Sequence, residues 1–180
     1  MKRIIVVIAI IFSVCAYAET EKNAIPSDTG MRLVWWPKVA PPKGWHFDQG
    51  SSYQFAFNAM APDGATFSNA ETVMYAKASY KPRVPDLKDL NSFVTQDLSS
   101  FENSAPKISI KNEAPMLTGD GVPLEVYSFS PVSEGNWEVV AYGEDAEYFL
   151  TFAISSRSQS GLASSLAALK QMVGNYRDKP

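Results

Sequence analysis

The only histidine of the chain, His46, is the first residue to consider for chemistry. A histidine can act as general base for a serine nucleophile, and the chain contains many serines. No Gly-x-Ser-x-Gly elbow is present, however, and Trp45 and Phe47 flank the histidine. Aromatic neighbours on both sides favour a hydrogen-bonded structural histidine. We therefore assign no catalytic residue from the sequence.

Metal ligands are scarce in this chain. His46 stands alone, Cys15 is the single cysteine, and no His-Glu-x-x-His motif is present, so zinc lacks a ligand set. Glu144, Asp145 and Glu147 crowd one short stretch, but their spacing matches no calcium loop and is typical of a solvated turn. We therefore expect no metal site and no cofactor.

Three tryptophans near the histidine are the best candidates for binding. Trp35 and Trp36 are adjacent, and Trp45 precedes His46. Indole rings at strand ends can form a stacking surface for a sugar or a peptide, or a contact with a protein. Alternatively, strand alternation buries one of Trp35 and Trp36 and leaves the other half-covered at the sheet edge. The predicted binding residues are Trp35, Trp36, Trp45 and His46.

These residues must be held by a sheet, and its clearest unit is the stretch 137–176. The strand that starts at Tyr148 is apolar on one face and semi-apolar on the other, a pattern typical of a sheet covered on both sides. Its large apolar side chains are Tyr148, Leu150, Phe152 and Ile154. A helix with a continuous apolar stripe follows. The stripe consists of Leu162, Leu166, Leu169, Val173 and Tyr176.

The rest of the chain predicts further strands and one more amphipathic helix. The helix is expected at 86–103, with Asp86 as its N-cap. Short turns between successive strands imply an antiparallel sheet, and the two long helices imply layers packed against it. The fold class is therefore α+β, with a single domain over residues 31–178. The further strands are expected at 31–36, 52–58, 72–80, 108–110, 124–129 and 136–142.

The chain begins like an exported protein. Met1-Lys2-Arg3 is basic, residues 4–12 are apolar, and Ala16-Tyr17-Ala18 fits a cleavage site, so residues 1–18 are predicted to be a signal peptide. The apolar run is about half of the roughly 20 residues that a membrane span needs. We expect no stable membrane anchor after cleavage, and a periplasmic or secreted location. Residues 19–30 are polar and are predicted to be a flexible leader.

The composition of the remaining 162 residues limits the classes of partner that they are expected to bind. They keep no cysteine, so they depend on a hydrophobic core instead of disulfides. Without Lys2 and Arg3 they carry 14 basic and 19 acidic residues, a net charge of −5. This balance argues against nucleic acid as a partner, because nucleic-acid binding needs basic clusters.

Several pieces of the chain follow one another in a recognisable layout. They are Pro42-Lys43-Gly44-Trp45, the helix at 86–103, Gly121-Val122-Pro123-Leu124, the strands at 137–142 and 148–152, and a final helix ending at Asn175-Tyr176. This layout resembles the superfamily of the photosystem PsbP extrinsic protein and the yeast Ran-binding nucleotide release factor, which includes DcrB-like envelope proteins. The resemblance spans residues 42–176 and has no invariant signature. It implies an α/β/α sandwich with a central antiparallel sheet, and an accessory or binding role without enzymatic activity.

Three functions follow from these observations. The first is an exported, non-enzymatic accessory or binding protein of the bacterial envelope, whose partner is another envelope protein, a peptide or a glycan. The second is a small exported hydrolase that uses His46 or dispersed carboxylates. The third is a structural, self-assembling component in which the strands at 31–36 and 52–58 form a subunit interface.

Overall fold

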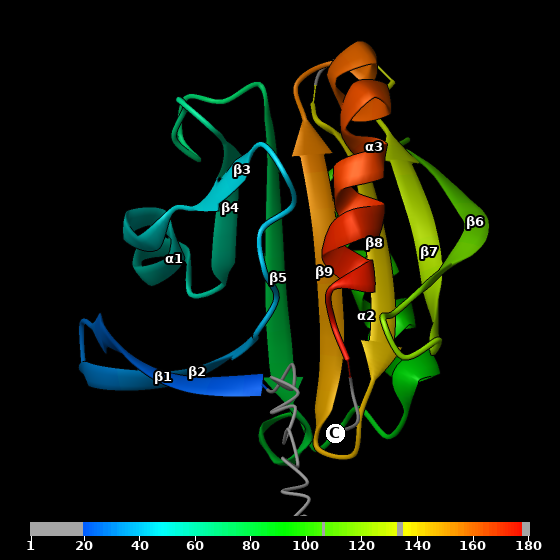
Figure 1. Cartoon of the computed structure of the whole chain (residues 1–180). Helices are drawn as coiled ribbons and strands as arrows, with labels where there is room; N and C mark the ends of the chain where they lie inside the picture. The colour runs from blue at the N-terminus through cyan, green and yellow to red at the C-terminus, as the bar shows by residue number, and fades with distance from the viewer. Residues whose placement is uncertain (1–19, 106, 133–134, 178–180) are drawn as a thin grey trace, which may run out of the picture.

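A computed structural model describes residues 20–105, 107–132 and 135–177 (Figure 1). Within these residues, nine strands form one antiparallel sheet, and three α-helices pack around it. The predicted antiparallel sheet is confirmed, and its combination with helices agrees with the predicted α+β class. The strands are β1 (Thr20–Ser27), β2 (Gly30–Pro37), β3 (Trp45–Phe47), β4 (Asn58–Pro62), β5 (Thr72–Tyr80), β6 (Ser109–Leu117), β7 (Pro123–Ser130), β8 (Trp137–Glu144) and β9 (Tyr148–Ser156). The helices are α1 (Gln49–Phe55), α2 (Leu90–Ser104), α3 (Gln159–Gly174) and the short 3-10 turn η1 (Lys81–Arg83).

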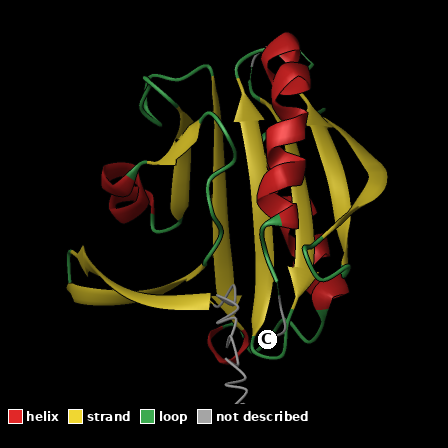
Figure 2. Ribbon diagram, in the orientation of Figure 1, coloured by secondary structure: helices red, strands yellow, loops and turns green. Residues whose placement is uncertain are grey.

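The sheet has a continuous main path and one side branch (Figure 2). Its strand order is β1-β2-β5-β9-β8-β7-β6, and β3 and β4 branch from the outer edge of β5. That edge is divided between two partners. β4 pairs with β5 at Met74–Ala76, whereas β2 pairs with it only through Trp35 and Ala78. The β1–β2 hairpin therefore diverges from the body of the sheet, as Figure 1 shows.

The central strand β9 has both faces buried, as its sequence pattern predicts. Its residues from Phe149 to Ser156 are all buried. Leu150, Phe152 and Ile154 pack in the core cluster that contains the α3 side chains. Phe149 and Ala153 pack in a second cluster with Phe93 and Val94 of α2. The two long helices therefore contact opposite faces of the sheet.

Each long helix begins at a side-chain cap. The Ser158 hydroxyl accepts the N–H of Gly161 at the start of α3. At the start of α2, Asp89 accepts the N–H of Ser92 and the Ser92 hydroxyl accepts the N–H of Asp89, a reciprocal capping box. The predicted cap at Asp86 is therefore wrong by one turn, because Ser92 supplies the matching partner for Asp89.

The strand predicted at 52–58 is wrong for most of its length, since residues 49–55 form α1. Alternation of Tyr53, Phe55 and Phe57 suggested a strand, but local hydrogen bonds favour a helix. Asp48 caps it by accepting the N–H of Ser51. The left-handed backbone of Ala56, with φ of 63°, then ends the helix and leads into β4.

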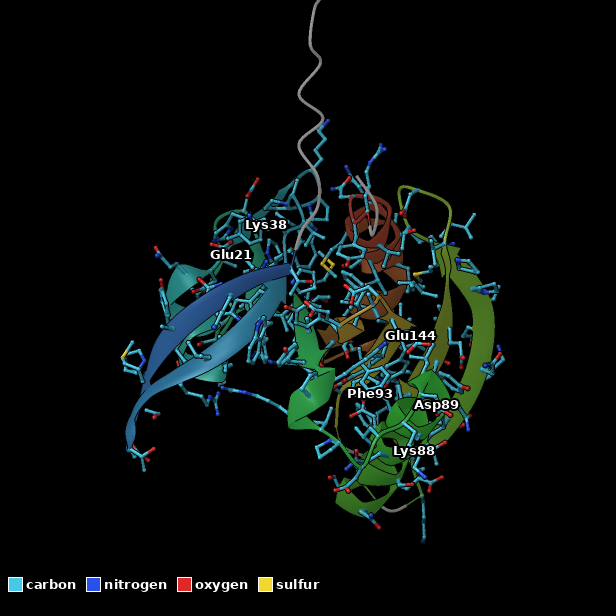
Figure 3. All side chains as sticks on the ribbon, turned by 90° about the horizontal axis from the view of Figure 1, so that it is seen from below. Glu21, Lys38, Lys88, Asp89, Phe93 and Glu144 are labelled. Carbon is cyan, nitrogen blue, oxygen red and sulfur yellow. The ribbon has the colours of Figure 1, made fainter. Side chains whose placement is uncertain are left out.

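The flexible leader predicted at 19–30 is also corrected, because Thr20–Ser27 form β1. The strand pairs with β2 over its whole length, from Thr20 opposite Pro37 to Ser27 opposite Gly30. Gly30 follows the two-residue turn with φ of 120°, which favours glycine. Polar composition suggested flexibility, but backbone pairing does not depend on side-chain polarity. Figure 3 shows Glu21 and Lys38 on the hairpin side, away from Asp89 and Phe93 of α2.

The predicted signal peptide, residues 1–18, lies outside the described residues. In the part of the chain that the structure covers, no helix has the length and apolar character needed to cross a membrane.

Candidate functional site

The two adjacent tryptophans of the predicted binding set lie on opposite faces of β2. Trp35 is 9% exposed and belongs to the core cluster on the α3 side. Its ring stacks on Tyr80 with 5.0 Å between centroids, and the guanidinium of Arg83 lies 4.7 Å from it. Trp35 is therefore a core residue, with a cation at its outer side.

Trp36 is half-buried on the other face of the strand. Its ring meets Tyr53 of α1 edge-on at 6.0 Å. Its indole N–H is buried and has no hydrogen-bond partner within the described residues. The ring is thus held against α1, where it helps to fix the helix on the sheet.

Trp45 and His46 are also divided between two environments. Trp45 is half-buried and packs against the α3-side core cluster. His46 points to the opposite side of β3, where its Nδ1 lies 3.7 Å from Oδ1 of Asp63. No serine hydroxyl of the described residues is hydrogen-bonded to His46. Trp35, Trp36, Trp45 and His46 therefore do not gather around one surface.

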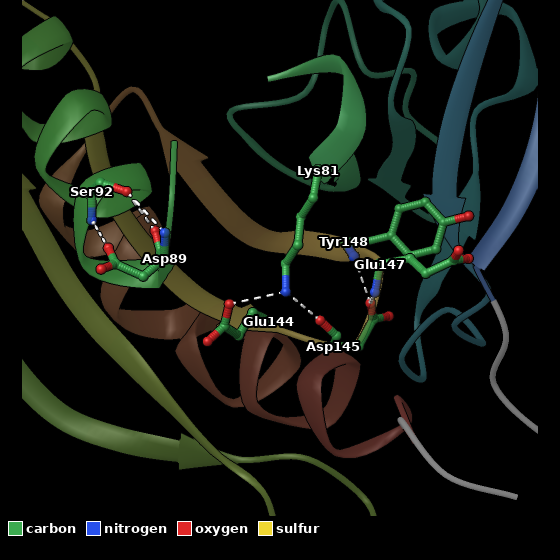
Figure 4. A network of polar contacts seen from close by, with 7 residues as sticks. All are labelled: Lys81, Asp89, Ser92, Glu144, Asp145, Glu147 and Tyr148. Atoms are coloured by element: carbon green, nitrogen blue, oxygen red, sulfur yellow. Dashed lines mark hydrogen bonds and ion pairs between the residues drawn. The ribbon is translucent and has the colours of Figure 1, made fainter. Parts of the chain in front are cut away.

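The acidic turn between β8 and β9 is a structural element (Figure 4). Lys81 Nζ lies 3.1 Å from Oε2 of Glu144 and donates to the carbonyl of Asp145 at 2.6 Å. The Asp145 carboxylate accepts the backbone N–H groups of Glu147 and Tyr148. These contacts join η1 to the turn. Among the described residues, no group of three or more His, Cys, Asp or Glu side chains is arranged to hold a metal ion.

An apolar groove beside α3 is the best-formed candidate site. Its volume is about 380 Å³, within the range of small ligand sites. We call it the α3 groove. It runs between one side of α3 and the strands β6, β7 and β8. Its walls are formed by Glu113, Ala114, Met116, Val126, Ser128, Ser130, Trp137, Val139, Gln159, Leu162, Ala163, Leu166 and Lys170.

Regular periodicity places these side chains. Val126, Ser128 and Ser130 alternate along β7 and so share one face, as do Trp137 and Val139 on β8. On α3, Leu162, Ala163 and Leu166 recur at three- and four-residue spacing. The register of β6 shifts between Glu113 and Met116, and such a bulge bends a strand. The bend curves the end of the sheet alongside α3.

The rim of the α3 groove carries both an acidic and a basic side chain. Glu113 accepts from Lys111 at 3.0 Å and from the Ser128 hydroxyl at 2.9 Å, and these hydrogen bonds hold the pKa of Glu113 below its ordinary value. Lys170 is exposed and makes no ion pair with any described residue. The groove can therefore bury an apolar group while its rim donates to and accepts from polar atoms.

Only part of this site could be recognised from the sequence. Leu166 belongs to the predicted helix stripe, yet it is only half-buried because it lines the groove. Trp137 is the one tryptophan left out of the predicted binding set. Neither residue could be assigned to a binding site from the sequence, since the groove depends on which strands lie beside α3.

Comparison with protein-family models and with curated proteins finds no match for this chain.

Proposed function

We propose that the chain is an exported, non-enzymatic accessory or binding protein of the bacterial envelope, built as a PsbP-like α/β/α sandwich. Its basic, apolar and small-residue start supports export. The packing of α2 and α3 against opposite faces of the sheet supports the sandwich. The position of His46, near Asp63 and without a serine partner in the described residues, favours binding over histidine-based hydrolysis.

The observation that carries the proposal is the α3 groove. Its occupant is a short apolar segment of a partner peptide or protein. Leu162, Leu166 and Trp137 offer apolar surface to side chains of such a segment. A polypeptide also brings backbone donors and acceptors, and Gln159, Ser130 and Lys170 supply polar groups beside the apolar wall.

Two exposed alanines of α3 provide a matched pair for the test. Ala163 lines the α3 groove, whereas Ala167 does not. The probe is N-phenyl-1-naphthylamine, an apolar dye whose emission rises when it leaves water. Ala163→Glu places a charge at the groove and weakens dye binding by about tenfold or more, since the bound dye would take water away from the carboxylate, which is costly. Ala167→Glu leaves dye binding unchanged.

The peptide character of the occupant is tested in cells. A photo-crosslinking amino acid at position 163 captures a protein through an apolar segment, identified by mass spectrometry of the linked peptide. The same group at position 167 does not. Equal dye binding by both glutamate variants, or equal capture at both positions, would show that the α3 groove is not the binding site.

A further inference from the structure

A second recess lies where the β1–β2 hairpin leaves the sheet. On one edge, β2 pairs with β1 along its full length. On the other edge, only Trp35 pairs with β5, so residues 30–34 face no strand among those described. Leu33 O, which accepts from Nη1 of Arg83 at 3.2 Å, belongs to this stretch. The hairpin thus presents part of a strand edge beside η1.

Two adjoining hollows follow this edge. One, of about 390 Å³, lies against β5 and is lined by Val34, Lys77 and Ser79 among others. The other, of about 480 Å³, extends toward the hairpin turn at Asp28 and Thr29. Arg32, Leu33 and Arg83 line both hollows. We call the combined recess the hairpin cleft.

The charge of the hairpin cleft is opposite to that of the whole chain. Arg32 from β2, Lys77 from β5 and Arg83 from η1 line the hollow against β5, and no carboxylate lines it. Asp28 is the one carboxylate that lines the other hollow, so the cations outnumber it. None of the three makes an ion pair with a described residue. The chain as a whole carries a net charge of −3. A concave surface lined by cations concentrates field and attracts anionic groups.

Arg83 is already fixed for such a contact. Its guanidinium lies over the Trp35 ring at 4.7 Å and donates to Leu33 O. An arginine has five N–H donors in a planar fork, so several remain for a carboxylate. Because packing holds the side chain, less conformational entropy is lost when a ligand binds.

We propose that the hairpin cleft binds an extended acidic segment of a partner protein, which adds as a strand to the free edge of β2. Main-chain hydrogen bonds to Met31 and Leu33, whose backbone groups point away from β1, give the segment its register. Its carboxylates face Arg32, Lys77 and Arg83. The length of the recess favours a chain over a single small anion, since five strand residues extend about 17 Å. This proposal does not depend on the α3 groove, and the two are tested with different probes.

The test uses a fluorescein-labelled peptide, Glu-Val-Glu-Val-Glu, and the full chain, with binding followed by fluorescence anisotropy. The peptide is expected to bind, and a Gln-Val-Gln-Val-Gln control is not. The double variant Arg32→Gln/Arg83→Gln weakens binding by about tenfold or more, because charge-assisted contacts are lost. Lys43→Gln/Lys88→Gln removes the same charge from exposed positions outside the cleft and changes binding less than twofold. Urea unfolding checks that each variant is folded.

Strand addition is tested by methylating backbone nitrogens of the peptide. Successive N–H groups of a strand point to opposite sides, so only alternate residues of the peptide donate to β2. One peptide is methylated at both valines and a second at the three glutamates. We expect one of these two peptides to lose binding and the other to keep it. Three results overturn the proposal. They are equal binding of the glutamine peptide, equal weakening by the two double variants, and displacement of the peptide by inorganic phosphate at equal concentration.

Discussion

The hydroxyl of Tyr142 lies 2.6 Å from Oδ2 of Asp97 and donates a hydrogen bond to it. Tyr142 is in β8 and is fully buried, whereas Asp97 is in α2. Burial and the Asp97 carboxylate raise the pKa of Tyr142 above its ordinary value of 10.0, so the hydroxyl stays protonated and able to donate. This bond fixes α2 on its face of the sheet.

Removing the hydroxyl should therefore loosen α2. Tyr142→Phe leaves the ring in place and deprives Asp97 of its donor, at an expected cost of about 1–3 kcal/mol in unfolding free energy. Tyr127 provides the control, since its hydroxyl makes only a 3.5 Å contact with exposed Glu125. Tyr127→Phe should change the free energy of unfolding by less than about 0.5 kcal/mol. Urea titration followed by circular dichroism measures both, and equal losses would contradict the proposed role.

A half-buried carboxyl on the same face, that of Glu138, gives a pH dependence. Burial raises the pKa of Glu138, the Asp97 charge raises it further, and a hydrogen bond from Ser155 opposes the shift. A raised pKa in the folded state means that stability is highest below the ordinary value of 4.5 and falls as pH rises through the folded pKa. The Glu138 carboxylate therefore destabilises the fold at neutral pH.

Glu138→Gln keeps an oxygen that accepts from Ser155 and removes the charge. We expect the variant to be more stable than the parent chain at pH 7, with a difference that shrinks as pH falls toward 4. The lowered pKa values of Asp48, Asp89 and Glu113 affect both proteins alike and cancel in the difference. Glu125→Gln, at an exposed site on β7, should show no such trend. A constant difference between pH 4 and pH 8 would contradict the assignment.

The start of α2 gives a direct test of the corrected cap. Asp89 accepts the N–H of Ser92 at 2.8 Å, which holds the pKa of Asp89 below its ordinary value. Asp89→Ala removes this contact and should lower the urea midpoint of unfolding. Asp86→Ala, three residues earlier and outside the capping box, should leave the midpoint unchanged. A lower midpoint for Asp86→Ala than for Asp89→Ala would show that Asp86 is the N-cap, as expected from the sequence.

Periodicity predicted the centre of this fold well. The alternation of β9 and the apolar stripe of α3 each predict that one face is buried. In the structure, these faces are buried against each other. Such patterns are local, so they can be interpreted without knowing how the rest of the chain folds. The same method failed at residues 52–58, where Asp48 capping and the left-handed Ala56 favour a helix over aromatic alternation.

The candidate sites could not be predicted because they depend on contacts distant in sequence. The α3 groove requires β6, β7 and β8 to lie beside α3, and the hairpin cleft requires β2 to part from β5 after one pair. Strand order decides both. The cluster of three tryptophans was a local signal. Alternation along β2 places Trp36 on the face opposite to Trp35, while Trp45 packs against the same core cluster as Trp35.

The first turn of α3 contains a glycine that the packing requires. A Cβ on Gly161 would lie 2.5 Å from Ser156 Oγ and 2.9 Å from Thr72 Oγ1. Ser156 and Thr72 are buried and hydrogen-bonded to each other at 2.7 Å across β9 and β5. The absence of a side chain at Gly161 therefore lets α3 approach the sheet over this pair.

Gly161→Ala should destabilise the fold, although alanine is normally the better helix former by about 1 kcal/mol. We expect a loss of about 1–3 kcal/mol, in the range of overpacked core substitutions. Gly174 is the matched control at the other end of α3, because a Cβ there meets no atom within 4 Å. Gly174→Ala should be neutral or stabilising by up to about 1 kcal/mol. Thermal and urea unfolding of the two variants give the comparison. Stabilisation by both substitutions would mean that α3 does not approach β5 and β9 as closely as this packing requires.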